Sequence, residues 1–93
     1  SKGALQTLIR TLSGELIGRG IRVNAVSPGP IATLLHGKIG MDEAAIKELV
    51  TQIPAGRRGD PSEVAKAVVF LASDEAAFTI GAELTIDGGM STL

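Results

Sequence analysis

The sequence contains no cysteine, no tryptophan and no tyrosine, and aromatic residues make up only 2% of its 93 residues. The absence of cysteine excludes disulfide frameworks, zinc ribbons and thiol catalysis, and nothing indicates an oxidising compartment. We therefore expect a cytoplasmic location. The 9 basic and 10 acidic side chains give a net charge of −1 and form no basic run. The sequence therefore predicts no nucleic-acid partner.

Long apolar stretches are missing as well. No run approaches the roughly 18 residues of a membrane span, and the first residues do not have the apolar centre of a signal peptide. We therefore expect no membrane partner. What remains is an ordinary globular composition, 44% hydrophobic and 20% charged, which suits one small domain. Because the chain opens on Ser1 rather than methionine, and a helical pattern follows at once, we expect a piece of a longer protein.

The first half of the chain predicts a helix, a strand and a loop. Apolar residues spaced by three and four predict a helix to about Gly18, where Gly18 and Gly20 provide the stop. Residues 21–27 are rich in β-branched side chains and predict a strand, which the Pro-Gly-Pro sequence at 28–30 ends. Residues 31–41 show no clean period and predict a loop.

The second half predicts two helices and a strand. Asp42 is positioned to cap a helix that ends at Pro54. Asp60, Pro61 and Glu63 occupy the N-cap, N1 and N3 positions of a capping box and start a helix over residues 61–73. That helix is apolar nearly all round, with Val64, Val68 and Leu71 as the stripe expected to face the sheet. Residues 82–86 alternate as a strand.

The order helix, strand, helix, helix, strand predicts an α/β fold. A strand, a helical crossover and a second strand form a βαβ unit, which is right-handed and parallel. We therefore expect residues 21–27 and 82–86 to be adjacent parallel strands. A two-stranded parallel sheet has little stability by itself, so we expect further strands to precede residue 1.

Several catalytic motifs are absent. The sequence contains no Walker phosphate loop, no HExxH, no EF-hand loop and no Gly-x-Ser-x-Gly elbow, and we expect no metal site. The glycine pair Gly18 and Gly20 is the only fragment of a dinucleotide fingerprint. It precedes a strand instead of following one, so we interpret it as a helix stop.

Four segments carry a recognisable pattern. They are SKGAL at 1–5, GIRVNAVSPG at 20–29, GDPSEVA at 59–65 and DGG at 87–89. In this order and spacing, which covers nearly the whole chain, they resemble the C-terminal portion of the short-chain dehydrogenase/reductase family. The resemblance implies that residues 1–93 are the C-terminal part of one Rossmann-like, doubly wound parallel sheet domain that binds NAD or NADP. It also implies hydride transfer between nicotinamide and a small carbonyl or alcohol substrate.

The resemblance gives Lys2 a catalytic and cofactor-binding role. Lys2 matches the lysine of the family's Tyr-x-x-x-Lys signature, whose tyrosine would lie three residues upstream of Ser1. The ammonium group would bond the nicotinamide ribose and lower the pKa of the tyrosine that exchanges a proton with the substrate. By residue type alone, Lys2 is a solvated lysine at a chain end.

The segment after the first strand is the expected nicotinamide contact. Open α/β sheets bind ligands beyond the carboxyl ends of their strands. By resemblance, the Ile31 backbone and the Thr33 hydroxyl would bond the nicotinamide carboxamide, while Pro28 and Gly29 would shape the turn beside the ring. Residues 34–59 would form much of the substrate pocket. On the residues alone, the Pro-Gly-Pro sequence simply ends a strand.

Other polar residues are expected to play structural roles. Asn24, on an apolar strand, should tie neighbouring segments together through its amide. His36 has no acidic or thiol partner nearby and is interpreted as a polar loop residue. Arg57 and Arg58 could steer an anionic ligand, but a solvated connector is the favoured interpretation.

The third helix indicates assembly. The sheet can cover only one of its faces, and the remaining apolar groups favour a homo-oligomer through residues 65–86. The family resemblance implies a dimer or a tetramer, and we expect a tetramer. Burial against other parts of the same chain is the alternative. The functional alternative is a non-catalytic fragment that serves only structure or assembly. Under either interpretation we expect the 93 residues alone to be inactive, because they lack the tyrosine and a complete dinucleotide site.

Overall fold

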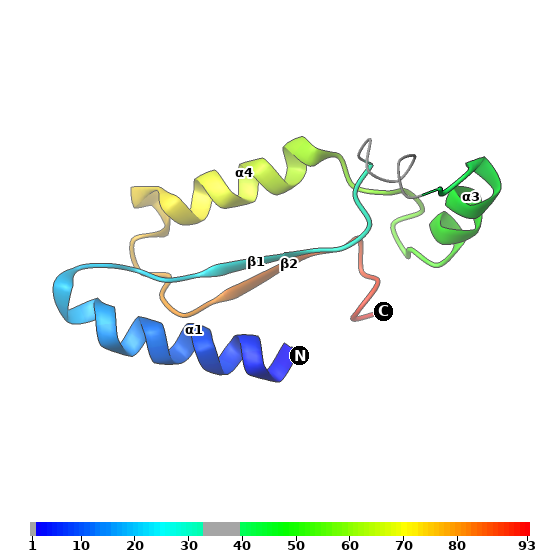
Figure 1. The fold of residues 1–93 in the computed structure, drawn as a ribbon. Helices are drawn as coiled ribbons and strands as arrows, with labels where there is room; N and C mark the ends of the chain where they lie inside the picture. The colour runs from blue at the N-terminus through cyan, green and yellow to red at the C-terminus, as the bar shows by residue number, and fades with distance from the viewer. Residues whose placement is uncertain (1, 33–39) are drawn as a thin grey trace. The chain divides into compact units, whose positions relative to one another are not determined.

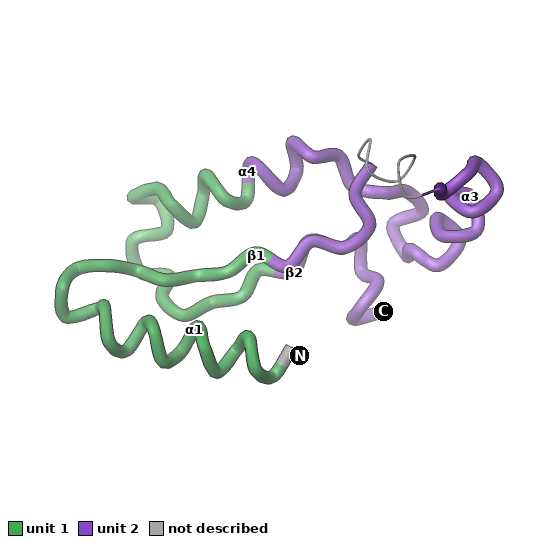
Figure 2. The backbone as a smooth tube through the Cα atoms, viewed as in Figure 1, with its two compact units in different colours: residues 1–26, 67–84 green, residues 27–66, 85–93 purple. Residues whose placement is uncertain are grey.

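The computed structural model describes the chain except for residue 1 and residues 33–39, and for Lys2 it describes the backbone only. The described elements follow the expected order helix, strand, helix, helix, strand, with two short 3-10 turns added (Figure 1). They are α1 Lys2–Leu16, η1 Ile17–Arg19, β1 Ala25–Pro28, α3 Glu43–Thr51, α4 Pro61–Ala72, η2 Asp74–Ala76 and β2 Glu83–Ile86. The chain forms two compact units (Figure 2), which are described in turn. Unit 1 comprises residues 1–26 and 67–84, and unit 2 comprises residues 27–66 and 85–93.

The two strands are neighbours in one sheet, as expected. The Ala25 N–H donates to the Ala82 carbonyl and the Gly29 N–H donates to the Ile86 carbonyl, both at 2.9 Å. Residue numbers increase in the same direction along both strands, from 25 to 29 and from 82 to 86, which identifies a parallel pair. The expected parallel βαβ arrangement is therefore confirmed, and the α/β fold with it.

The first strand is shorter than expected, because β1 begins at Ala25 and not at residue 21. The pairing before that point is irregular. Gly81 donates to the Val23 carbonyl, but the next ladder bond runs from Ala25 to Ala82, so two residues oppose Asn24. The displaced Ala82 N–H donates instead to the Asn24 side-chain oxygen at 2.9 Å. A side chain thus replaces a ladder bond where the sequence pattern predicts a regular strand.

In unit 1, α1 and the last turns of α4 lie on opposite sides of the strands (Figure 1). Helix α1 buries Ile9 and the Ser13 side chain, and the Ser13 hydroxyl donates to the Val23 carbonyl at 3.1 Å. The α-helical geometry ends at Leu16, two residues before the expected stop, and continues as the η1 turn. That turn ends at Gly20, whose left-handed φ of 76° suits glycine and confirms its predicted role as a stop.

Arg22 joins the strand segment to the end of α4. Its guanidinium donates to the carbonyls of Leu71 at 2.8 Å, Ala76 at 2.9 Å and Ser73 at 3.1 Å. Because the last carbonyls of a helix have no partner within the helix, a cation placed there satisfies them and favours the helix dipole. The C-terminal end of α4 is therefore capped by a side chain from the first strand segment.

In unit 2, both helices start as the sequence predicts. The Asp42 carboxylate accepts the Ala45 N–H at 2.8 Å and caps α3. At α4, the Asp60 N–H donates to Glu63 and the Ser62 N–H donates to Asp60, each at 2.9 Å, which is a capping-box arrangement. Helix α3 ends at Thr51, three residues before Pro54.

The described part of the chain buries few large apolar side chains. Those below one-tenth exposure are Ile9, Leu71 and Ala76 in unit 1 and Ile53 in unit 2. Of the stripe expected to face the sheet, Leu71 is buried, whereas Val68 is 49% exposed. Val69 and Phe70 are exposed as well. None of the helices in the described ranges is long and apolar enough to cross a membrane.

Candidate functional site

The segment that follows β1 lies in unit 2 and contains most of the expected cofactor-binding residues. Pro28 is the last residue of β1, and Gly29 continues the pairing with β2. Ile31 then forms an isolated parallel bridge with Gly59, just before α4. Thr33 and His36 lie outside the described residues, and for Lys2 the structure gives only its position as the first residue of α1.

Gly29 is required by a close approach between backbones. A β-carbon at this position would lie 2.5 Å from the β-carbon of Asp87 and 2.9 Å from its α-carbon. Distances this short exclude any side chain unless one of the segments shifts. Gly29 thus allows the end of β1 to contact the turn after β2. Its role beside a nicotinamide stays a prediction.

The bridge between Ile31 and Gly59 uses both polar backbone atoms of Gly59 but neither of those of Ile31. Gly59 donates to the Pro30 carbonyl at 2.9 Å and accepts the Ala32 N–H at 2.8 Å. In such a pair, the residue between the two bonded neighbours turns its own N–H and C=O away from the partner strand. Among the described residues, neither polar atom of the Ile31 backbone has a hydrogen-bond partner.

The chain bends at Pro30, between Gly29 and the Ile31 bridge, so the extended period of β1 does not continue to Ile31. The Ile31 backbone presents one donor and one acceptor on the side away from Gly59. A primary carboxamide carries the complementary acceptor and donor.

The turn after β2 is closed by one carboxylate. One oxygen of Asp87 accepts the Gly89 N–H at 3.0 Å. The other accepts the Ser91 N–H at 3.0 Å and the Ser91 hydroxyl at 2.6 Å. The hydrogen bond from the Ser91 side chain is the largest influence that lowers the pKa of Asp87, so the group is ionised at neutral pH.

An ion pair stands beside the bridge. The Arg57 guanidinium binds the Glu63 carboxylate through two hydrogen bonds, of 2.7 and 3.0 Å. Arg57 and the Asp60 N–H, in that order, lower the pKa of Glu63 to about 2. The sequence favours a solvated connector here, and Arg57 is 61% exposed while it pairs with Glu63.

Two cavities help to define what these units can hold. The cavity beside the Ile31 segment, lined in part by Pro30 and Gly88, measures about 80 Å³, which is more than one water molecule needs. A larger one of about 530 Å³ lies in unit 1 beside Arg22 and Asn24. Both of those side chains already bond backbone groups of unit 1, so they provide little for a ligand. The candidate site within the described residues is the backbone of the half-buried Ile31.

The hydrogen bonds of the Asn24 side chain confirm its predicted structural role. Its side-chain nitrogen donates to the Thr79 carbonyl at 2.9 Å, while its oxygen accepts the Ala82 N–H. Within the described ranges, no group of three His, Cys, Asp or Glu side chains is arranged to hold a metal ion.

Sequence reasoning missed three participants near the site and the sheet. The sequence pattern gives Gly59 only a place in the GDPSEVA segment, although a β-carbon there would lie 2.8 Å from the Ile31 side chain. It gives Asp87 only a place in the DGG segment, and the serine four positions later is the available signal for the closure of the turn. Arg22 is the third participant. Its contacts could not be predicted, because no local sequence pattern indicates that a strand residue caps a helix about fifty residues away.

Comparison with known proteins gives a consistent assignment over almost the whole chain. A family model described as enoyl-(acyl carrier protein) reductase matches residues 1–91. Galactitol 2-dehydrogenase (L-tagatose-forming) of Cereibacter sphaeroides is 45% identical over 89 residues, which cover 96% of this chain and 35% of that protein. The chain therefore spans about a third of the length of this relative.

Solved structures support the same family assignment. An Agrobacterium tumefaciens protein described as a 2-deoxy-d-gluconate 3-dehydrogenase, with bound NADP, has a TM-score of 0.85 at 38% identity; the match covers 99% of this chain and 37% of that one. A short chain dehydrogenase family protein from Francisella tularensis has a TM-score of 0.83 at 32% identity, covering 99% of this chain and 42% of the other.

Proposed function

Because the chain belongs to the short-chain dehydrogenase/reductase family, we propose that it forms the nicotinamide-side part of an oxidoreductase that uses NAD or NADP. The reaction is hydride transfer between the nicotinamide and a small carbonyl or alcohol substrate. Relatives named as dehydrogenases of sugar alcohols and sugar acids support this class of substrate. The bound NADP of the Agrobacterium protein supports the class of cofactor.

The observation that carries the proposal is the Ile31 backbone, whose N–H and C=O have no hydrogen-bond partner among the described residues. Its N–H and C=O fit the carboxamide of a nicotinamide, and the Gly29 contact with Asp87 fixes the backbone on which they lie. When bound, the cofactor would supply the hydride. The Ile31 backbone and the Thr33 hydroxyl orient the ring, Pro28 and Gly29 shape the turn, and residues 40–59 border the substrate.

Lys2 is proposed as the cationic group of the site. Its ammonium holds the nicotinamide ribose and lowers the pKa of the family's tyrosine, which exchanges the proton with the substrate oxygen. This role rests on the family pattern at residues 1–5. In the absence of that tyrosine, the 93-residue chain by itself is expected to show no turnover with either cofactor, while the intact protein is active.

The direct test is to measure absorbance of NADH and NADPH with sugar-derived ketones and the corresponding alcohols, using the intact protein. Lys2→Ala should lower kcat by about 100-fold, the lower end of general acid–base contributions. Lys66→Ala, a control at an exposed lysine of α4, should leave it unchanged. Near-normal turnover in Lys2→Ala would remove Lys2 from the mechanism.

A second pair of variants tests the carboxamide contact. Thr33→Ala should raise KM for the cofactor by about tenfold, because one hydrogen bond to the carboxamide is lost. Thr7→Ala removes a hydroxyl that bonds the Gly3 carbonyl within α1, so KM for the cofactor should not change. If no cofactor supports turnover in the unmodified intact protein, the proposed function is wrong and the chain belongs to a non-catalytic relative of the family.

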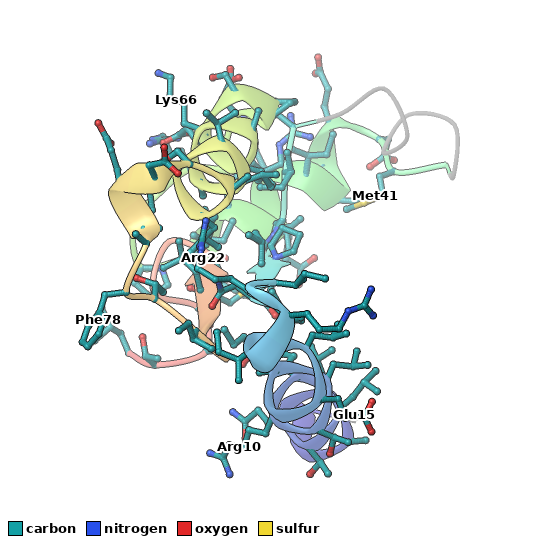
Figure 3. All side chains as sticks on the ribbon, turned by 90° about the vertical axis from the view of Figure 1, so that its left-hand side faces the viewer. Arg10, Glu15, Arg22, Met41, Lys66 and Phe78 are labelled. Carbon is teal, nitrogen blue, oxygen red and sulfur yellow. The ribbon has the colours of Figure 1, made fainter. Side chains whose placement is uncertain are left out.

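We also propose a homo-oligomer, most simply a tetramer, located in the cytoplasm. Support comes from unit 1, where Val69 is 68% exposed, Phe70 is 43% exposed and Phe78, which projects outward in Figure 3, is 99% exposed. Apolar groups of this size are rarely left in water together. Light scattering of the intact protein should give a tetramer mass, and Val69→Arg should reduce it, whereas Glu48→Arg on α3 should not. A monomer mass at micromolar concentration would refute the assembly.

A further inference from the structure

The turn after β2 contacts two segments that are far apart in the sequence. On one side, Asp87 lies against the α-carbon of Gly29, where a β-carbon would approach to 2.5 Å. On the other side, the Gly88 carbonyl accepts the Ala55 N–H at 2.9 Å, just beyond the end of α3. All of these residues belong to unit 2.

The contact with the end of α3 is close and buried. A β-carbon on Gly88 would lie 2.8 Å from the Ile53 side chain and 3.1 Å from that of Ala55. Ile53 is only 3% exposed, and its N–H donates to the Val50 carbonyl in the last turn of α3. The C-terminal end of α3 is thus held to the turn by a hydrogen bond and by tight apolar packing.

The contact with the segment after β1 is equally direct. The Gly29 N–H donates to the Ile86 carbonyl, one residue before Asp87. From Gly29, the chain reaches the unpaired Ile31 amide in two residues, and Gly59 holds the intervening Pro30 carbonyl. A shift of the turn would therefore shift the amide that is proposed to meet the nicotinamide.

We infer that the Asp87–Gly89 turn is a shared brace that positions both the Ile31 amide and the end of α3, and that Asp87 is its positioning residue. The inference rests on the proposed function for the roles of those two segments. The carboxylate of Asp87 sets the shape of the turn, since it accepts the Gly89 N–H, the Ser91 N–H and the Ser91 hydroxyl. The cofactor-side backbone and the substrate-side helix are therefore aligned by one group that contacts neither ligand.

Amide hydrogen exchange in the intact protein tests the brace without turnover. In Asp87→Ala, exchange should accelerate about tenfold both in residues 28–32 and in residues 52–56, because the hydrogen bonds that shape the turn are lost together. Exchange in α1, residues 5–16, should not change. Asp87→Asn, which keeps an oxygen to accept the Gly89 N–H, should restore slow exchange in part.

Asp42→Ala is the matched control, because Asp42 is also a carboxylate that accepts a backbone N–H in unit 2. It should accelerate exchange at the start of α3 and leave residues 28–32 unchanged. In steady-state kinetics, Asp87→Ala should raise KM for cofactor and for substrate together, about tenfold each, whereas Asp42→Ala should raise only that for substrate.

Three results would overturn the brace. One is acceleration in only one of the two segments, and another is an equal acceleration in α1, which would mean general destabilisation. Should Asp87→Ala fail to fold, Ser91→Ala removes only the 2.6 Å hydroxyl bond and should still accelerate both segments; no change in either segment is the third. Absence of turnover in the unmodified protein would refute the proposed function while leaving the exchange result intact.

Discussion

Asn24 uses both ends of its side-chain amide on the segment that leads into β2. The nitrogen donates to Thr79 and the oxygen accepts from Ala82, so two backbone groups of that segment are satisfied by one side chain. Arg22, two residues earlier, similarly satisfies three carbonyls. Polar side chains on the first strand segment therefore hold together parts of unit 1 that regular strand pairing does not reach.

Replacing Asn24 with leucine should destabilise the protein measurably. The change leaves the Thr79 carbonyl and the Ala82 N–H without their partners, at a cost of about 2 kcal/mol in the free energy of unfolding. Urea denaturation followed by circular dichroism gives the value. Gln52→Leu, at the exposed end of α3, is the control and should change the free energy very little. Equal stability of the two variants would contradict a structural role for Asn24.

The lowered pKa of Glu63 predicts that the stability of the folded chain decreases in acid. Its pKa is 4.5 when unperturbed and about 2 in the folded chain, where Arg57 and the Asp60 N–H bond the carboxylate. A lowered folded pKa means that the stabilisation is fully present above about 4.5 and is lost as the pH falls through about 2. Thermal denaturation between these pH values should show this loss, and in Glu63→Gln this part of the pH dependence should be absent. An unchanged pH profile in that variant would show that other groups carry the acid sensitivity.

Several glycines of unit 2 lie where two segments of the chain approach each other closely. A β-carbon would lie 2.5 Å from Asp87 at Gly29 and 2.8 Å from Ile53 at Gly88, so neither fits unless a segment shifts. At Gly59 the nearest atom is the terminal methyl group of Ile31, at 2.8 Å, which can move aside. Gly88 also has a left-handed φ of 64°. The connections between strands and helices are therefore as tightly packed as the elements themselves.

Two alanine substitutions should have opposite effects. Gly29→Ala forces a β-carbon against Asp87 and should lower the free energy of unfolding by about 1–3 kcal/mol, the usual cost of overpacking. Gly14→Ala, inside α1 with no atom within 4 Å of the new β-carbon, should raise it by about 0.5–1 kcal/mol through helix propensity. Melting temperatures measured side by side give both signs, and a stable Gly29→Ala variant would contradict the close approach.

Sequence reasoning predicts the elements whose signals are local. The starts of α3 and α4 follow from Asp42 and from the Asp60-to-Glu63 pattern, because a cap acts within a few residues of itself. The start of β1 at Ala25 does not, since it depends on Asn24 meeting a segment more than fifty residues away. The site divides in the same way. The turn after β1 is visible in the sequence, whereas its contacts with Gly59 and Asp87 exist only in the fold.

The whole described chain has a thin apolar core. Only Ile9, Leu71, Ala76 and Ile53 among its apolar residues are buried, while the apolar groups of α4 and the Phe78 loop remain exposed. This distribution differs from that of a typical small domain, in which most large apolar side chains are inside. It is consistent with a chain that spans about a third of its relatives.

The isolated 93-residue chain should therefore be only marginally stable. We expect a free energy of unfolding below the roughly 5 kcal/mol at the lower end of ordinary domains, and strong binding of a hydrophobic dye such as ANS. Urea titration and dye fluorescence, compared with the intact protein, provide the measurement. A sharp unfolding transition at high urea together with no dye binding would show that the exposed apolar groups do not limit stability.

The two ends of α4 are secured by chemically different groups. Carboxylates of Asp60 and Glu63 hold the first turn, and the Arg22 guanidinium holds the last carbonyls. Carboxylates lose their charge in acid and then accept hydrogen bonds less strongly, whereas the carbonyls that Arg22 binds carry no charge to lose. Acid should therefore unwind α4 from its Pro61 end first.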